Sequence, residues 1–514
     1  LMHRFNKLSV MPKTEHMSGH EFLEKNLKDN KNLAKWDGEL YLEMHRGTFT
    51  TKSKMKRYNR QLEFKLREAE IISTLRRLNG AEYPHEEIRD IYKKLLVNQF
   101  HDILPGSHIT PVYRDAMADY EEIDRRLDKI IGCGDKYFNS LNFTRNHLTF
   151  VADENGESTR YGKKGNWVIP ALAPLSSGEI TKDDCSDEWI SLGDEVVTPF
   201  YRISFGADGS IVSLYDIELD REWVKGEFNK LRLYKDNPGM YDAWDILPNY
   251  TDREIAVNVV SPLEVTEKTS EAVAFSCTLA TEKSTWKRII RVFRRSRGIE
   301  VENVVDWNEK HVLAKAQFDC NLLTRKAVCD TSAGYIERET HRNTSWQQAR
   351  FEVCHHKWVD MAETDGGIAL INDSKYGVGL LENSMSLSLL RATIRPDVTS
   401  DLGHHEFSYM IYPHGDDFVK AEINNIAFEY NIPIGKADLT CENSFGELYM
   451  QTMKMSEKGH MIVVRLSEQN GRRGKIKLGG KVKLLNFLED VVDVTNTIEY
   501  KPFEIITIGI PYNK

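Results

Sequence analysis

The sequence predicts an α+β multidomain protein, in which an antiparallel three-helix bundle is followed by antiparallel β-sandwich domains. Three observations carry this prediction. Between residues 53 and 132, apolar residues recur every three or four positions in three separate segments. From about residue 138 to the end, the apolar period changes to two, as in half-buried strands. The length of 514 residues is enough for about three or four domains.

Each predicted helix has its own start and stop signals. The first covers 52–79 and stops at Asn79-Gly80, a pair typical of a left-handed C-cap. The second begins at Pro84, with two glutamates in its first turn, and ends before Pro105. The third begins at Thr110-Pro111 and ends before Gly132. Short connections between amphipathic helices favour an up-down-up bundle.

The strands that follow are short and are separated by turn residues. The clearest pair is 286–293 with 299–307, joined by a turn at Ser296-Arg297-Gly298. Before the bundle, the segment 38–47 alternates apolar and polar residues, which predicts one further strand. Either a buried edge strand or a strand lining a cleft would give this alternation.

Composition excludes several classes of function. The 69 Lys and Arg residues against 78 Asp and Glu residues give a net charge of −9, so we expect no nucleic-acid partner. No run approaches the roughly 18 apolar residues that span a bilayer, so we expect no membrane partner. The first ten residues lack the apolar core of a signal peptide. The seven cysteines are dispersed singly, which predicts reduced thiols and a cytoplasmic location.

The clearest chemical signal is the segment NQFHDILPGS at 98–107, where the second helix ends. His101 is a candidate zinc ligand, and the neighbouring Asp102 could bind a sugar hydroxyl or orient a ligand. The simpler interpretation is a helix C-cap, with the imidazole at the negative end of the helix dipole. The residues alone favour this simpler interpretation, because a catalytic zinc ion needs about three protein ligands.

Other candidates are weaker. Trp244 and Asp245 follow a Pro-Gly pair and could form a sugar-stacking platform, although a buried tryptophan at a sandwich corner explains them slightly better. Glu43, His45 and Arg46 are candidates for the rim of a binding site. A second metal site at the histidines 404, 405 and 414 is disfavoured, since adjacent strand residues face opposite sides.

The chain resembles glycoside hydrolase family 38, the zinc-dependent α-mannosidases, and in particular the bacterial and cytosolic branch. The matching blocks occur in order along nearly the whole chain, at 38–50, 56–60, 98–107, 242–246, 305–309, 350–352, 357–360, 372–377, 389–391, 401–407, 413–414 and 502–504.

The resemblance implies roles for two residues. His101 matches the zinc-ligand histidine that the helical domain contributes, and Asp102 matches the residue that contacts the mannose hydroxyls. The remaining zinc ligands, the nucleophile and the acid/base belong to the family's N-terminal α/β barrel and find no match here, so we expect no catalytic residue in this chain. The implied division is a barrel remnant at 1–35, the bundle at 36–137, and β-domains at 138–200, 201–425 and 426–514.

The function implied is that of one part of a zinc-dependent, retaining exo-α-mannosidase acting on terminal α-linked mannose in a mannoside or oligosaccharide. We expect these 514 residues alone to be incomplete and inactive. The alternative is a non-catalytic carbohydrate-binding or assembly module on the same scaffold. Apolar surface on the bundle leaves self-association into a homo-oligomer open.

Overall fold

The computed structural model describes residues 2–28, 30, 32–182, 188–441 and 445–512. The chain forms two compact units, Leu1–Leu42 and Glu43–Lys514. The small unit holds helices α1 (Met2–Phe5) and α2 (Gly19–Leu27), neither of which buries a residue. A capping box begins α2: the Ser18 hydroxyl accepts from the Glu21 amide, and the Glu21 carboxylate accepts from the Ser18 amide.

The strand predicted over 38–47 is wrong. Gly38 to Leu42 are irregular, and Glu43–Phe49 form the 3-10 helix η1. A long-range contact holds this conformation, because the Gly47 amide donates to the carbonyl of Trp244 at 2.8 Å. A Cβ atom at position 47 would lie only 2.9 Å from the carbonyl oxygen of Asp245, so this close approach requires glycine.

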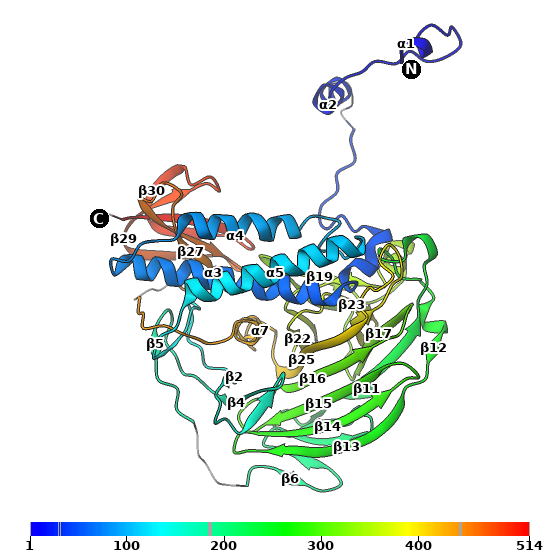
Figure 1. Cartoon of the computed structure of the whole chain (residues 1–514), viewed down its shortest axis with the longest axis vertical. Helices are drawn as coiled ribbons and strands as arrows, with labels where there is room; N and C mark the ends of the chain where they lie inside the picture. The colour runs from blue at the N-terminus through cyan, green and yellow to red at the C-terminus, as the bar shows by residue number, and fades with distance from the viewer. Residues whose placement is uncertain (1, 29, 31, 183–187, 442–444, 513–514) are drawn as a thin grey trace. The chain divides into compact units, whose positions relative to one another are not determined.

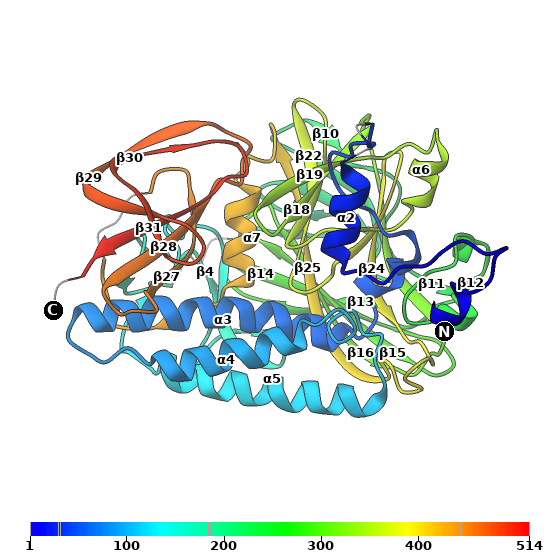
Figure 2. The ribbon, with the colours of Figure 1, turned by 90° about the horizontal axis from the view of Figure 1, so that it is seen from above.

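The three predicted helices are confirmed as α3 (Ser53–Leu78), α4 (His85–Asn98) and α5 (Thr110–Ile131). They lie side by side in the large unit (Figures 1 and 2), with α3 next to the sheets. Most of each predicted apolar stripe is buried, as expected for a bundle. Two residues that the apolar spacing of the second helix predicts to be buried are exposed instead. Leu96 is 60% exposed, and Phe100, which lies beyond the helix end, is also exposed.

The described residues of the remaining chain form six sheets, in which every pairing is antiparallel, as predicted. The largest has nine strands in the order β13 (Asn258–Lys268), β14 (Ala272–Ala280), β15 (Thr285–Phe293), β16 (Ile299–Trp307), β25 (Gly403–Gly415), β22 (Gly366–Asn372), β21 (Trp358–Ala362), β18 (Lys326–Thr331) and β19 (Gly334–Glu339). The next has six, in the order β12 (Glu254–Ile255), β11 (Val224–Lys235), β17 (Val312–Cys320), β24 (Ser384–Arg391), β23 (Gly377–Leu381) and β20 (Val353–Cys354).

A five-stranded C-terminal sheet has the order β27 (Tyr449–Met455), β28 (Met461–Ser467), β31 (Ile505–Pro511), β29 (Gly474–Leu485) and β30 (Val491–Tyr500). A second five-stranded sheet has the order β10 (Arg221–Glu222), β9 (Ile211–Asp216), β8 (Tyr201–Phe205), β7 (Val196–Val197) and β6 (Ser191–Leu192). Two sheets have three strands each. One has the order β2 (Thr149–Ala152), β4 (Lys163–Val168) and β3 (Ser158–Arg160), and the other has the order β26 (Gly435–Lys436), β1 (Tyr137–Phe138) and β5 (Ser177–Gly178).

The nine-stranded and six-stranded sheets pack face to face. Phe318 of β17 lies edge-on to Tyr409 of β25, with ring centroids 6.0 Å apart. Arg288 of β15 donates to the side chain of Asn229 of β11 at 2.7 Å, so the layers share polar as well as apolar contacts. The predicted hairpin is confirmed as β15 and β16, in which Trp286 pairs with Val305.

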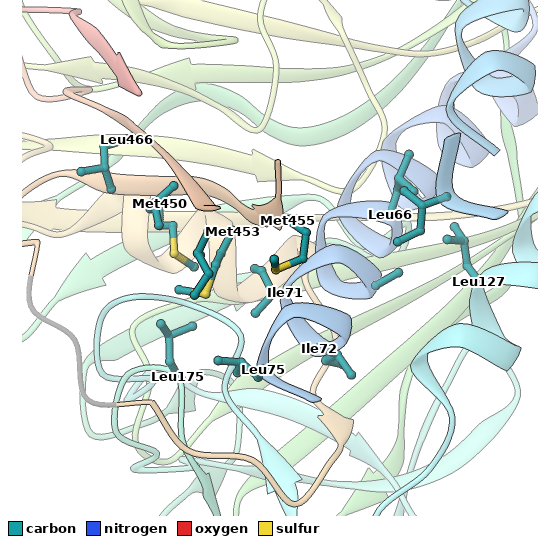
Figure 3. Close-up of a cluster of buried hydrophobic side chains, with 14 of the residues drawn as sticks. Leu66, Ile71, Ile72, Leu75, Leu127, Leu175, Met450, Met453, Met455 and Leu466 are labelled. Carbon is teal, nitrogen blue, oxygen red and sulfur yellow. The ribbon is translucent and has the colours of Figure 1, made fainter. Parts of the chain in front are cut away.

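One hydrophobic core joins the bundle to the C-terminal sheet. Figure 3 shows Ile71 and Leu75 of α3 directed toward Met453 and Met455 of β27. Ile71 is completely buried, although it lies outside the stripe that faces the other helices. The helix α3 therefore buries two faces, one against its bundle partners and one against the sheet.

This shared core predicts that Ile71→Ala destabilises the protein by about 2–5 kcal/mol, because it leaves a cavity between α3 and β27. The measurement is the midpoint of chemical denaturation. The matched control is Leu96→Ala on the exposed side of α4, which should change stability by no more than about 0.5 kcal/mol. Equal effects of the two substitutions would contradict a core shared by helix and sheet.

In the part of the chain that the structure describes, no helix has the length and apolar content needed to cross a bilayer. Six of the seven cysteines are described, at positions 133, 277, 320, 329, 354 and 441, and none of these six is joined in a disulfide. The seventh, at position 185, lies outside the described residues.

Candidate functional site

His101 and Asp102 lie in a tight turn directly after α4. The Ile103 amide donates to the Phe100 carbonyl at 2.8 Å, and the Gly106 amide donates to the Ile103 carbonyl at 2.9 Å. The side chain of His101 is 78% exposed and that of Asp102 is 55% exposed. The imidazole Nε2 lies 3.5 Å from the Asp102 Oδ2. This turn therefore presents an adjacent imidazole and carboxylate to solvent, where both are accessible to a ligand.

The turn is fastened to the first turn of α3. The buried ammonium of Lys56 donates to the carbonyls of Leu104 at 3.0 Å and Pro105 at 3.3 Å. Gly106 has φ +89°, and a Cβ atom there would lie 2.7 Å from the carbonyl oxygen of Thr51. These contacts fix the backbone immediately after His101, so its exposed side chain extends from a rigid support.

The beginning of α3 is in turn fixed to the sandwich. The Asp401 carboxylate accepts from the backbone amides of Lys52 at 2.5 Å and Ser53 at 2.7 Å, at the positive end of the helix dipole. The buried Lys52 ammonium pairs with Asp397, which also accepts from the Thr110 hydroxyl at 2.7 Å. Two aspartates from one loop of the sandwich thus hold the starts of α3 and α5.

A second buried lysine lies beneath this junction. Lys375 donates to the Ser53 hydroxyl at 2.6 Å and to the Leu389 carbonyl at 2.8 Å, and its Nζ lies 3.7 Å from the centroid of the Phe407 ring. Burial lowers the pKa of Lys375 to about 7, and the nearby Asp373 and Asp401 only partly oppose this effect. At pH 7 the folded protein therefore holds about half of this group in its neutral form.

The lowered pKa of Lys375 predicts that stability increases with pH above 7. Between about pH 7 and pH 10.4 the unfolded chain binds this proton and the folded chain does not, so the gain is up to about 1.4 kcal/mol per pH unit. Lys375→Met should remove this contribution from the pH dependence of the urea midpoint. The exposed Lys129→Met is the control. An unchanged slope in Lys375→Met would contradict the assignment.

The other predicted residues form a separate contact between η1 and the loop that follows β11. Arg46 pairs with Asp245 at 3.1 Å, donates to the Ala349 carbonyl at 2.9 Å, and lies 4.5 Å above the Phe351 ring. Trp244 is half-buried and meets η1 through its carbonyl. The side chains of Arg46 and Asp245 are thus engaged in contacts within the protein.

Glu43 and His45 are less constrained. Glu43 is exposed, whereas His45 is half-buried and its Nδ1 has no hydrogen-bond partner among the described residues. The roles of the predicted site residues, His101 and Asp102 included, stay predictions.

The remaining histidines are separated. His404 is 54% exposed and lies 3.1 Å from Asp306, whereas His405 is buried and contacts the Asp401 carbonyl at 2.7 Å. His414 is buried and pairs with Asp360 at 2.9 Å. In the described ranges, no three His, Cys, Asp or Glu side chains are close enough together to hold a metal ion. Within that part of the chain, His101 and its neighbour Asp102 are not joined by a third side chain of these types.

Sequence reasoning missed the residues that support the turn, namely Lys56, Asp397 and Asp401. Lys56 and Asp401 lie in the motif blocks at 56–60 and 401–407, which was the available signal. Neither is adjacent in sequence to what it supports, so periodicity and capping rules could not assign these contacts.

Three family models match the chain in order. They are the "Alpha mannosidase middle domain" at residues 43–133, the "Glycosyl hydrolases family 38 C-terminal domain" at 196–399, and the "Glycosyl hydrolases family 38 C-terminal beta sandwich domain" at 447–508. The first covers η1 and the three helices. The second covers most of the two facing sheets, and the third covers the C-terminal sheet.

Curated relatives match over most of the chain. "Alpha-mannosidase 2C1" of Mus musculus is 28% identical over 91% of this chain and 48% of its own length. "Alpha-mannosidase G" of Dictyostelium discoideum is 29% identical over 97% of this chain and 55% of its own length. The chain thus spans about half the length of the curated relatives it matches.

A solved structure shows the same fold. A crystal structure of "an alpha-mannosidase from Enterococcus faecalis" covers 97% of this chain and 72% of its own chain, with a TM-score of 0.78 and 13% identity. The three domain models, found in order on a fold of this kind, place the chain in glycoside hydrolase family 38, of which it contains the middle and C-terminal domains.

Proposed function

We propose that the chain is part of an exo-α-mannosidase that removes terminal α-linked mannose from a mannoside or oligosaccharide. The observation that carries the proposal is the ordered match to three family domains, together with relatives that are themselves named α-mannosidases. The turn at 98–107 supports it, since it presents His101 and Asp102 to solvent on a fixed backbone.

We further propose that the enzyme depends on zinc and that His101 supplies one ligand. The exposed imidazole fits one position of a zinc site, but a catalytic site needs about three protein ligands, so the others must come from residues outside the described part of this chain. Bound zinc would act as a Lewis acid toward the sugar hydroxyls. Asp102, beside His101, would accept hydrogen bonds from hydroxyl groups of the same mannose unit.

The proposed reaction is retaining. Such a reaction needs two carboxyl groups about 5–5.5 Å apart, one as the nucleophile and one as the acid/base. We assign neither role to a residue of this chain. Asp102 cannot fill both roles, and its position next to His101 suits it to binding. The contribution of this chain is to hold one metal ligand and one sugar contact in place.

The alternative is a non-catalytic carbohydrate-binding or assembly module on the same scaffold. It is favoured by the absence, among the described residues, of three side chains able to hold a metal ion. The discriminating observation is the sequence of the parent protein before residue 1. Further zinc ligands and two catalytic carboxyl groups there would support the enzyme.

The decisive experiment is an assay of the parent protein on 4-nitrophenyl α-mannoside and α-linked oligosaccharides, with and without added zinc. We expect release of mannose that is lost on chelation and restored by zinc. If the parent protein hydrolysed no α-mannoside in the presence of zinc, the enzyme proposal would be wrong, and the non-catalytic carbohydrate-binding or assembly module would be the remaining hypothesis.

The dispersed cysteines support a cytoplasmic location, and cell fractionation would test it. Sedimentation analysis would show whether the protein is a homo-oligomer.

A further inference from the structure

A cleft of about 710 Å³ lies between α3, the end of α4 and the edges of the sheets. It passes beneath the turn at 98–107, where Gln99, Leu104 and Pro105 form part of its wall, but neither His101 nor Asp102 lines it. Aromatic rings provide much of the remaining surface, from Phe64 and Phe428 among others. The volume is that of a site for a small organic ligand.

The charged side chains that line this cleft are unbalanced. Five of them are basic and one is acidic; the basic residues are Lys56, Arg60, Arg67, Lys357 and Arg465, and the acid is Glu63. Burial lowers the pKa of Lys56 to about 7, so this lysine is only partly charged at neutral pH. Lys357 has a carboxylate partner, since its ammonium lies 2.9 Å from Asp330. Its charge is therefore already compensated within the protein.

Arg60 is the best-placed cation. It is only 3% exposed, and its guanidinium stacks 4.4 Å above the ring of Tyr376. Its Nε donates to the Tyr376 hydroxyl at 2.9 Å, and its Nη1 donates to the side-chain oxygen of Asn431 at 3.0 Å and the Asn372 carbonyl at 3.3 Å. Its Nη2 is buried without a hydrogen-bond partner in the described part of the chain.

Arg67, two helical turns further along α3 and also buried, is likewise hydrogen-bonded to neutral acceptors. It donates to the carbonyls of Met450 and Ser140, both at 3.0 Å, and to the Ser140 hydroxyl at 3.4 Å. Neutral acceptors satisfy N–H groups without cancelling the charge. Carboxylates lie near both arginines, Glu63 near Arg60 and Glu68 near Arg67, but in the described part of the chain neither accepts a hydrogen bond from its arginine, so an oxyanion that does so would add a charge-assisted contact. The planar fork of arginine is suited to phosphate and sulfate oxygens.

We infer that this cleft binds an oxyanion of the phosphate or sulfate class, free or carried on a small organic molecule, with the Nη2 of Arg60 as a direct donor. Arg67 adds positive charge to the wall. The aromatic rings offer a surface for an attached organic group. The inference does not rest on the proposed glycosidase activity, since binding of this kind requires neither zinc nor a mannoside.

The test is calorimetric titration of the 514-residue chain with inorganic phosphate, sulfate and phenyl phosphate at pH 7, with chloride keeping the ionic strength constant. We expect saturable binding of phosphate and sulfate. Tighter binding of phenyl phosphate than of inorganic phosphate would identify an organic ester as the preferred source, and equal binding would identify the free ion. Absence of saturable binding for all three would overturn the inference.

Two substitutions with opposite expected effects locate the site. Arg60→Met should weaken phosphate binding by about 10-fold to 100-fold, the loss of one charge-assisted contact. Glu63→Gln removes the acidic side chain from the wall but keeps its shape and its contact with Gln99, so it should tighten binding by about threefold. Arg125→Met on the exposed side of α5 is the matched control and should leave binding unchanged.

Circular dichroism shows whether each variant is folded, and the binding results are interpreted accordingly. If Arg60→Met folds and binds phosphate as well as the unmodified chain does, the inference is wrong. If Arg60→Met does not fold, Glu63→Gln decides, because this exposed residue on α3 should tolerate the change. Unaltered or weaker phosphate binding in folded Glu63→Gln then overturns the inference.

Discussion

Replacing His101 with alanine is expected to abolish zinc-dependent turnover by the parent enzyme while leaving its fold intact. The side chain is 78% exposed, so its removal leaves no cavity and breaks no buried contact. Removal of a group that only hydrogen-bonds to a metal ligand lowers metal affinity or activity by roughly 10-fold to 100-fold. Removal of the proposed ligand itself should lower both by more. The measurements are the rate of mannoside hydrolysis and the bound zinc per protein, each beside a thermal unfolding curve.

His404→Ala is the matched control for this substitution. His404 is also exposed and also lies next to an aspartate, at 3.1 Å, but it is on the sandwich, where no metal role is assigned. We expect the activity and zinc content of the His404→Ala enzyme to equal those of the unmodified parent. An enzyme with His101→Ala that keeps its zinc and its rate would show that this histidine is only a helix cap.

The same reasoning predicts that the 514-residue chain alone binds zinc weakly and does not hydrolyse an α-mannoside. The described residues bring one imidazole and one carboxylate together at the turn, where a catalytic site needs about three ligands and a reaction that retains configuration needs two further carboxyl groups. Metal analysis and the mannosidase assay test this directly. Stoichiometric zinc and activity in the isolated chain, both lost in His101→Ala, would show that a complete site lies within these residues.

Arg391→Met is expected to destabilise the protein by about 3–5 kcal/mol, because it breaks a buried ion pair by removing one partner. Arg391 is buried and donates to the Asp236 carboxylate at 2.7 Å and to the carbonyls of Asp242 and Asp245, each at 2.5 Å. It also donates to the Thr51 hydroxyl at 3.2 Å. Its loss would leave the buried Asp236 without its cation and release the loop that meets η1.

Chemical denaturation, followed by tryptophan fluorescence, measures this effect. The double variant Arg391→Met with Asp236→Asn should recover part of the loss, since no charge is then left buried alone. Arg125→Met on the surface of α5 controls for removing an arginine. A loss below about 1 kcal/mol in Arg391→Met would mean that solvent reaches Asp236 and that the loop is held by other contacts.

Local patterns in the sequence were sufficient for the helices and the main hairpin. The first helix was predicted at 52–79 and is observed at Ser53–Leu78, because apolar spacing and the Asn79-Gly80 stop depend only on neighbouring residues. Strands β15 and β16 follow for the same reason. The segment at 98–107 was predicted as a turn at the end of a helix, and α4 does end there.

Contacts between distant segments decided the rest. The segment 38–47 has the alternation of a strand, yet Glu43–Phe49 form a 3-10 helix because Gly47 hydrogen-bonds to Trp244, far away in sequence. Phe100 continues the apolar stripe of α4 but is exposed beyond the helix end. In the first case a tertiary contact overrides a pattern that is correct for an isolated segment, and in the second the helix ends before the apolar pattern does.

Tertiary contacts also determine how the candidate site is held in place. The sequence identified His101 and Asp102 by their motif, but the position of their turn depends on Lys56, and through α3 on Asp401, which is 348 residues from its partner Ser53. A buried charge is stable only where an opposite charge or a set of polar acceptors surrounds it. Such surroundings come from segments far apart in the chain, so the sequence by itself determined which residues could act, and only the folded structure determined what holds them in place.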